Sequence, residues 1–97
     1  MHEVTDDPAA GRLELVVDGH RAEIVYRDVG RRMVVLHTGV PEELAGRGIG
    51  GELMRAVIDR AGRGGLTVVP ICPFARTWMT RHPDEVGDVD VDWDAKD

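Results

Sequence analysis

The sequence has little cysteine, few aromatic residues and no long apolar run. Its single cysteine, Cys72, leaves no partner for an intrachain disulfide, which is typical of the reducing cytoplasm. No stretch approaches the roughly 18 consecutive apolar residues that a membrane-spanning helix needs. The acidic start, Met1–Asp7, lacks the apolar core of a signal peptide and the basic character of a transit peptide. The sequence therefore predicts a cytoplasmic protein that does not act at a membrane.

Lysine is also scarce, so that nearly all positive charges belong to arginines. Over most of the chain these arginines are balanced by acidic residues. Residues 84–97 hold seven acidic residues against Lys96, whereas residues 1–83 hold 11 arginines and 11 acidic residues. The net charge of −6 therefore belongs to the last segment. A neutral domain argues against nucleic-acid binding, because that function depends on clustered Lys and Arg side chains that displace counterions.

The chain of 97 residues, with 42% hydrophobic residues, is long enough for one domain and one core. Residues 1–12 contain little apolar side chain and predict a flexible lead-in, residues 13–83 predict the folded domain, and residues 84–97 form an acidic tail. In this tail Val89, Val91 and Trp93 alternate with aspartates. That pattern fits either a short edge strand or a mobile segment.

Apolar periodicity predicts an α/β (α+β) fold with a mixed sheet. The expected order is β-β-β-α-β-α, with strands at 13–17, 21–29 and 33–38, a helix at 48–62, a strand at 66–71 and a helix at 73–82. Asp18-Gly19 predicts a tight hairpin between the first two strands. The third strand is apolar on both faces and is expected at the centre of the sheet, buried on both sides. The last helix is expected to turn Phe74, Trp78 and Met79 inward.

Two of these strands should run in the same direction. The helix at 48–62 connects the strands at 33–38 and 66–71, so the three elements form a βαβ unit with a right-handed crossover. In such units both carboxyl ends and the start of the connecting helix lie at one edge, where open α/β sheets bind ligands. His37, the glycine-rich loop that opens the helix, and Cys72 all fall at that edge.

The loop carries four glycines in six residues, Gly46, Gly48, Gly50 and Gly51. Glycine disfavours helix, but it lets the backbone approach a ligand and leaves N–H groups at a helix start free for an anion. Arg47 adds a permanent charge suited to phosphate. A flexible loop without a ligand is the alternative. A Walker A loop is disfavoured because Glu52 follows Gly51, and a dinucleotide fold is disfavoured because the connection from the third strand is too long.

The stretch Arg47-Gly48-Ile49-Gly50-Gly51-Glu52-Leu53 resembles the acetyl-coenzyme A (acetyl-CoA) diphosphate loop of the GNAT N-acetyltransferase superfamily. The wider pattern, from His37-Thr38-Gly39-Val40-Pro41 to Val69-Pro70-Ile71-Cys72-Pro73-Phe74, resembles a minimal single-domain subgroup of it. The resemblance covers residues 13–83 and implies a GNAT-like fold with acetyl-CoA as cosubstrate. It departs at Ala45, where the superfamily usually has Gln or Arg. The cofactor-binding residues that it implies are Val40, Gly46, Arg47, Gly48, Ile49, Gly50 and Gly51.

The resemblance also implies that His37 and Cys72 are catalytic. Cys72 precedes Pro73 and so should cap the second helix, where the helix dipole favours a thiolate that could act as nucleophile or as acid. A small buried apolar residue is the alternative for Cys72. His37 should share a face with Met33 and Val35 and could accept a proton from an amine, or it could be a core histidine.

The resulting hypothesis is an acetyl-CoA-dependent N-acyltransferase that acts on an amine of a protein or small molecule, as a monomer or homodimer. The alternative is a non-catalytic module that binds coenzyme A or another protein. Neither requires a metal: His2, His20 and His82 are scattered and have no metal-ligand spacing.

Overall fold

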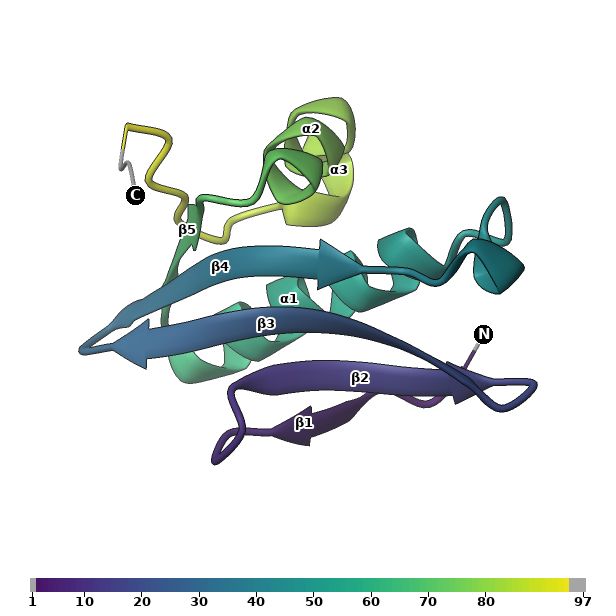
Figure 1. The fold of residues 1–97 in the computed structure, drawn as a ribbon. Helices are drawn as coiled ribbons and strands as arrows, with labels where there is room; N and C mark the ends of the chain where they lie inside the picture. The colour runs from purple at the N-terminus through teal and green to yellow at the C-terminus, as the bar shows by residue number, and fades with distance from the viewer. Residues whose placement is uncertain (1, 95–97) are drawn as a thin grey trace.

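The computed structural model describes residues 2–94 and contains one five-stranded sheet with helices packed against it (Figure 1). The strands are β1 (Thr5–Asp7), β2 (Arg12–Val17), β3 (His20–Val29), β4 (Arg32–Gly39) and β5 (Thr67–Pro70). The helices are the 3-10 turn η1 (Glu42–Leu44), α1 (Ile49–Gly64), α2 (Pro73–Arg81) and α3 (Pro83–Val86).

The strands lie in the order β1-β2-β3-β4-β5, with antiparallel pairs up to β4 and a parallel pair β4–β5. The mixed α/β fold and the βαβ unit predicted from the sequence are therefore confirmed. The predicted hairpin is present as well, since Asp18 and Gly19 both have positive φ, at 52° and 79°. A two-residue turn of this type matches the twist of its flanking strands.

Helix α1 crosses one face of the sheet and carries its apolar stripe onto it (Figure 1). Leu53, Val57 and Ala61 on that stripe are fully buried. The helix continues past the predicted end and stops at Gly65, whose positive φ of 64° closes it. Helix α2 adds Trp78 and Met79 to the same core. The side chains that α1 and α2 bury against the sheet include Leu13, Leu15, Ile24, Tyr26, Met33, Val35 and Val68.

Phe74 on α2 differs from the prediction. It was expected to point inward, but 41% of it is exposed, because it belongs to the first turn of α2 and packs over the start of α1. Strand β4 does lie between two neighbours, as predicted. Its Met33 and Val35 are fully buried, whereas Val34 and Leu36 on the other face are half-buried.

A β-bulge interrupts the pairing of β3 with β4. Tyr26 pairs with Val35 but Val25 pairs with His37, so Leu36 is an extra residue on β4. An extra residue reverses the alternation of side chains beyond it. Thr38, opposite the buried Ile24, therefore faces the α1 side, while His37 faces the other side. The prediction that His37 shares a face with Met33 and Val35 is wrong for this reason.

The described parts of both terminal segments, residues 2–12 and 84–94, contain regular structure or contacts with the sheet. Residues 5–7, inside the predicted lead-in, form strand β1 along β2. At the other end, α3 and the segment 89–93 pack on the domain: Val86 is buried, and Val91 forms a parallel bridge with Val68 at the free edge of β5. The alternation of Val89, Val91 and Trp93 therefore reflects an edge segment. Residues 95–97 of the acidic tail lie outside the described residues.

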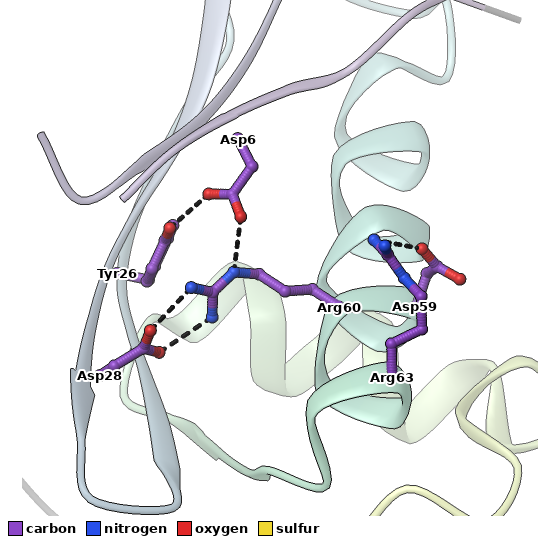
Figure 2. A network of polar contacts seen from close by, with 6 residues as sticks. All are labelled: Asp6, Tyr26, Asp28, Asp59, Arg60 and Arg63. Carbon is purple, nitrogen blue, oxygen red and sulfur yellow. Dashed lines mark hydrogen bonds and ion pairs between the residues drawn. The ribbon is translucent and has the colours of Figure 1, made fainter. Parts of the chain in front are cut away.

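A polar network ties the second half of α1 to the sheet (Figure 2). Arg60 of α1 donates two hydrogen bonds to Asp28 on β3, at 2.9 and 2.7 Å, and one to Asp6 on β1, at 2.8 Å. Tyr26 donates its hydroxyl to Asp6, and the Arg60 guanidinium lies 4.2 Å from the centre of the Tyr26 ring. The arginine thus holds β1, β3 and α1 together.

Candidate functional site

A cavity of about 510 Å³ lies between the glycine-rich loop and α2, beside the carboxyl end of β4. Its wall combines loop backbone with the aromatic face of α2. The lining residues are Val40, Leu44, Ala45, Gly46, Gly48, Ile49, Gly50, Gly51, Arg55, Phe74, Trp78 and His82. This is the sheet edge at which the sequence predicted a ligand site.

The loop residues beside the cavity carry free backbone amides. Within residues 2–94, none of the N–H groups from Gly46 to Gly51 has a hydrogen-bond acceptor, and the first helical bond is donated by Glu52 to the Gly48 carbonyl. Gly46 and Gly48 have φ of 78° and 75°, which other residues rarely adopt. Free amides at a helix start carry the positive end of the helix dipole, so they can bind an anion.

Gly50 and Gly51 also allow α1 to approach α2. A Cβ atom on Gly50 would lie 2.5 Å from Cζ of Phe74, and one on Gly51 would lie 3.3 Å from Nε1 of Trp78. A side chain at either position would therefore crowd an aromatic ring of α2, so close packing of α1 on α2 favours glycine at both.

The α2 side of the cavity contains groups that the sequence reasoning missed. The ring of His82 stacks on Trp78 with 4.4 Å between centroids, and its Nδ1 donates to the Trp78 carbonyl at 2.7 Å. Arg55 lies one turn after Gly51, with its guanidinium 5.8 Å from the Trp78 ring. The spacing of four residues in Gly51–Arg55 and in Trp78–His82 would have placed both pairs on one helix face.

Arg47, the cation expected at the site, does not line the cavity. Its NH1 pairs with a carboxylate oxygen of Asp18 in the β2–β3 turn, at 3.0 Å, and half of its side chain is exposed. The structure therefore brings together Val40 and the predicted loop residues Gly46, Gly48, Ile49, Gly50 and Gly51, but not Arg47.

Cys72 lies at the N-cap of α2, as the sequence indicated, and is 4% exposed. Its Sγ is 3.4 Å from Oγ1 of Thr38, within hydrogen-bond range, and its backbone N–H donates to the Val35 carbonyl. Cys72 does not line the cavity; Phe74, two residues later, does. The bulge in β4 makes Thr38, rather than His37, the neighbour of this thiol.

His37 is exposed on the opposite face of the sheet. Its Nε2 and Cγ of Glu23 flank Gly39, at 3.5 and 3.7 Å from the point where a Cβ would lie. A shallower hollow of about 330 Å³ on this face is lined by Arg21, Glu23, Gly39, Val40 and Pro41. Val40 borders both hollows, so the two faces meet at the end of β4.

No group of three or more His, Cys, Asp or Glu residues among those that the structure describes could hold a metal ion. In the same part of the chain, none of the helices has the length and apolar character required to cross a membrane.

Comparison with known proteins assigns this fold and loop to a family. The family profile of the GCN5-related N-acetyl-transferases matches residues 12–89. Among solved structures, the chain is similar to a candidate N-acetyltransferase from Staphylococcus aureus, described as GCN5-like. The sequences are 29% identical, the TM-score is 0.68, and the match covers 86% of this chain and 82% of that one. No curated protein matches the sequence. The profile covers most of the chain, and the chain belongs to the GCN5-related N-acetyltransferase family.

Proposed function

We propose that this protein binds acetyl-CoA through the amides of Gly46–Gly51 and transfers the acetyl group to an amine. The observation that carries the proposal is the run of unpartnered N–H groups that opens α1 inside a 510 Å³ cavity. A diphosphate fits this donor set, because it presents several acceptor oxygens and negative charge to the positive end of the helix. Bound acetyl-CoA would supply an acetyl group activated as a thioester.

The acyl end of the ligand belongs near the end of β4 and the start of α2. Val40 and Phe74 line the cavity there. Thr38 precedes Val40 by two residues and Cys72 precedes Phe74 by two residues, so the Thr38–Cys72 pair lies close to this end of the cavity. In the proposal the Cys72 thiol, held by Thr38, delivers a proton to the leaving thiolate or acts as nucleophile. His37 faces the opposite side of the sheet and accepts the proton of an amine that approaches from there.

A non-catalytic coenzyme A-binding module is the second candidate. It is favoured by one observation: His37 and Cys72 lie on different sides of β4, and neither lines the cavity. In this case the amides would bind the diphosphate in the same way, but no acyl transfer would follow.

Calorimetric titration with coenzyme A, followed by an acetyl-transfer assay, tests the proposal. The wild-type protein should bind coenzyme A. When it is given acetyl-CoA together with a lysine peptide or a polyamine, it should produce free coenzyme A, which is detected through its thiol. Cys72→Ala and His37→Ala should each lower the transfer rate about a hundredfold without a change in coenzyme A affinity. His20→Ala, at the start of β3, is the matched control and should leave the rate unchanged.

The two readouts separate the candidates. Absence of coenzyme A binding contradicts both. Binding without transfer to any of the amines contradicts the acyltransferase proposal and leaves the binding module. Transfer that survives both substitutions at full rate contradicts the catalytic roles of Cys72 and His37 and also contradicts the non-catalytic module.

A further inference from the structure

We propose that Arg55, and not Arg47, is the arginine that contacts the diphosphate of coenzyme A, and that its guanidinium is held in place for this contact by Glu85. This inference rests on the proposed function, because it names a further binding residue of the same cavity. Arg55 is the arginine among the lining residues, and the sequence pattern gave it only a place on the polar face of a helix.

The position of Arg55 follows from helix geometry. It lies four residues after Gly51, so its side chain lies over the same face of α1 as the amides of the first turn. Its NH1 is 3.4 Å from the point where a Cβ on Gly51 would lie. The cation and the free amides are therefore adjacent, and an anion at the helix start can accept hydrogen bonds from both.

Glu85 of α3 determines which edge of the guanidinium is available. Arg55 donates from Nε to Oε1 of Glu85 at 2.5 Å and from NH2 to Oε2 at 3.3 Å. This pairing occupies the Nε–NH2 edge and leaves NH1 directed at Gly51. The hydrogen bond from Arg55 also lowers the pKa of Glu85 from its ordinary value. The Trp78 ring lies against the same guanidinium.

Arg47 shows the opposite arrangement. It belongs to the loop by sequence, but its NH1 is paired with Asp18 outside the cavity. To contact a diphosphate in the cavity, Arg47 would have to reach it from outside the cavity lining, whereas Arg55 lines the cavity and has NH1 in place. A charge-assisted hydrogen bond to phosphate is about twice as strong as a neutral one, so loss of Arg55 should be measurable even at a partly exposed site.

The test measures the affinity for coenzyme A and for dephospho-coenzyme A, which lacks the 3′-phosphate, by calorimetry at low salt. Arg55→Ala should weaken the binding of both ligands roughly tenfold. Arg55→Lys keeps the charge but cannot hold Glu85 and donate to the ligand together, so its affinity should be intermediate. Arg63→Ala, a matched removal of charge further along α1, should leave the affinity unchanged, and Arg47→Ala should have less than one third of the Arg55→Ala effect. Thermal unfolding checks that each variant is folded.

Glu85 is tested against its neighbour Asp84. Both substitutions, Glu85→Gln and Asp84→Asn, remove one negative charge from α3, but only the first releases Arg55. Glu85→Gln should therefore bind coenzyme A more weakly than Asp84→Asn. Tighter binding by Glu85→Gln would show that Glu85 competes with the ligand, which would overturn its positioning role.

The other outcomes are equally decisive. Wild-type affinity in Arg55→Ala, or a larger loss in Arg47→Ala, would overturn the inference while the proposed function stands. A loss for coenzyme A alone would move the contact to the 3′-phosphate and overturn the diphosphate assignment. Absence of any binding by the wild type would overturn the proposed function and this inference together.

Discussion

The two ends of α1 are built for different purposes. At its second half, Arg60 is bound to Asp6 and Asp28 and packed on Tyr26, so that all three nitrogens of its guanidinium have a partner (Figure 2). At its first turn, the amides of Gly46–Gly51 have no partner within the described residues, and a cavity lies in front of them. One end of the helix is satisfied by the protein itself, whereas the other carries the free donors to which the proposed function assigns a ligand.

This contrast indicates how a chain of 97 residues can keep an open site. Unpaired backbone donors and a glycine-rich helix start weaken the first turn. The network at the second half anchors the same helix to β1 and β3, so the helix stays docked although its start is poorly stabilised. Stability and ligand binding should therefore respond to different substitutions.

The largest effect is expected for Arg60→Ala. It removes three hydrogen bonds and the contact with Tyr26, and it leaves the Asp6 and Asp28 carboxylates close together without a cation. The free energy of unfolding should fall by about 2 kcal/mol, from the lost charge-assisted hydrogen bonds and the lost cation–π contact, measured by urea denaturation. Arg63→Ala, which removes an exposed pair with Asp59, should change it by less than about 0.5 kcal/mol. Equal losses in the two variants would remove the contrast between the two ends.

High pH should lower the free energy of unfolding through the contacts at the same end of α1. Burial, and then the hydrogen bond to Asp6, raise the pKa of Tyr26 above its ordinary value. The folded state therefore keeps the phenolic proton when the unfolded chain, with a pKa near 10, begins to lose it. The stabilisation is complete below about pH 10 and declines by up to about 1.4 kcal/mol per pH unit above it.

Tyr26→Phe provides the control for this prediction. Urea denaturation between pH 9 and pH 11.5 should show a steep loss of stability in the wild type and a shallower one in Tyr26→Phe. Parallel curves would mean that Tyr26 does not couple its ionisation to folding.

A smaller effect is expected at the open end. In Gly50→Ala the added methyl group would meet the Phe74 ring, so the unfolding free energy should fall by about 1 kcal/mol. In a Phe74→Ala background that contact is absent, and Gly50→Ala should instead stabilise by up to about 1 kcal/mol through helix propensity. A double-mutant cycle measures the difference. If Gly50→Ala changed the unfolding free energy in the same direction in both backgrounds, the contact with Phe74 would not be the reason for glycine at position 50.

Periodicity and turn residues were enough to predict strands β2 to β5, the βαβ unit and the glycine loop, because each depends on local patterns, but they missed strand β1. The bulge in β4 was not predictable in this way. Leu36 is an ordinary strand residue, and its extra place appears only in the pairing of β3 with β4. That single residue decides that Thr38 and not His37 lies beside Cys72.

The roles of the arginines were also hidden. Arg55 and Arg60 both occur on the polar face of an amphipathic helix, where solvated charges are the usual interpretation. Their partners Glu85 and Asp28 are 30 and 32 residues away in the sequence, so no local pattern connects them. The loop residue Arg47 was a reasonable candidate by sequence. Its partner Asp18 lies in the β2–β3 turn, and no local pattern connects that turn with the glycine-rich loop.

The bridge between Val68 and Val91 has a consequence for the sheet as a whole. The Val68 N–H donates to the Asp90 carbonyl, and the Asp92 N–H donates to the Val68 carbonyl. Without these bonds, β5 would present open main-chain groups that invite a strand from another molecule. The aspartates of this segment place negative charges along the edge of the sheet, so two molecules repel each other where their edge strands could otherwise pair. Residues 90–92 thus cover the edge of β5 and protect it from pairing with a strand of another molecule.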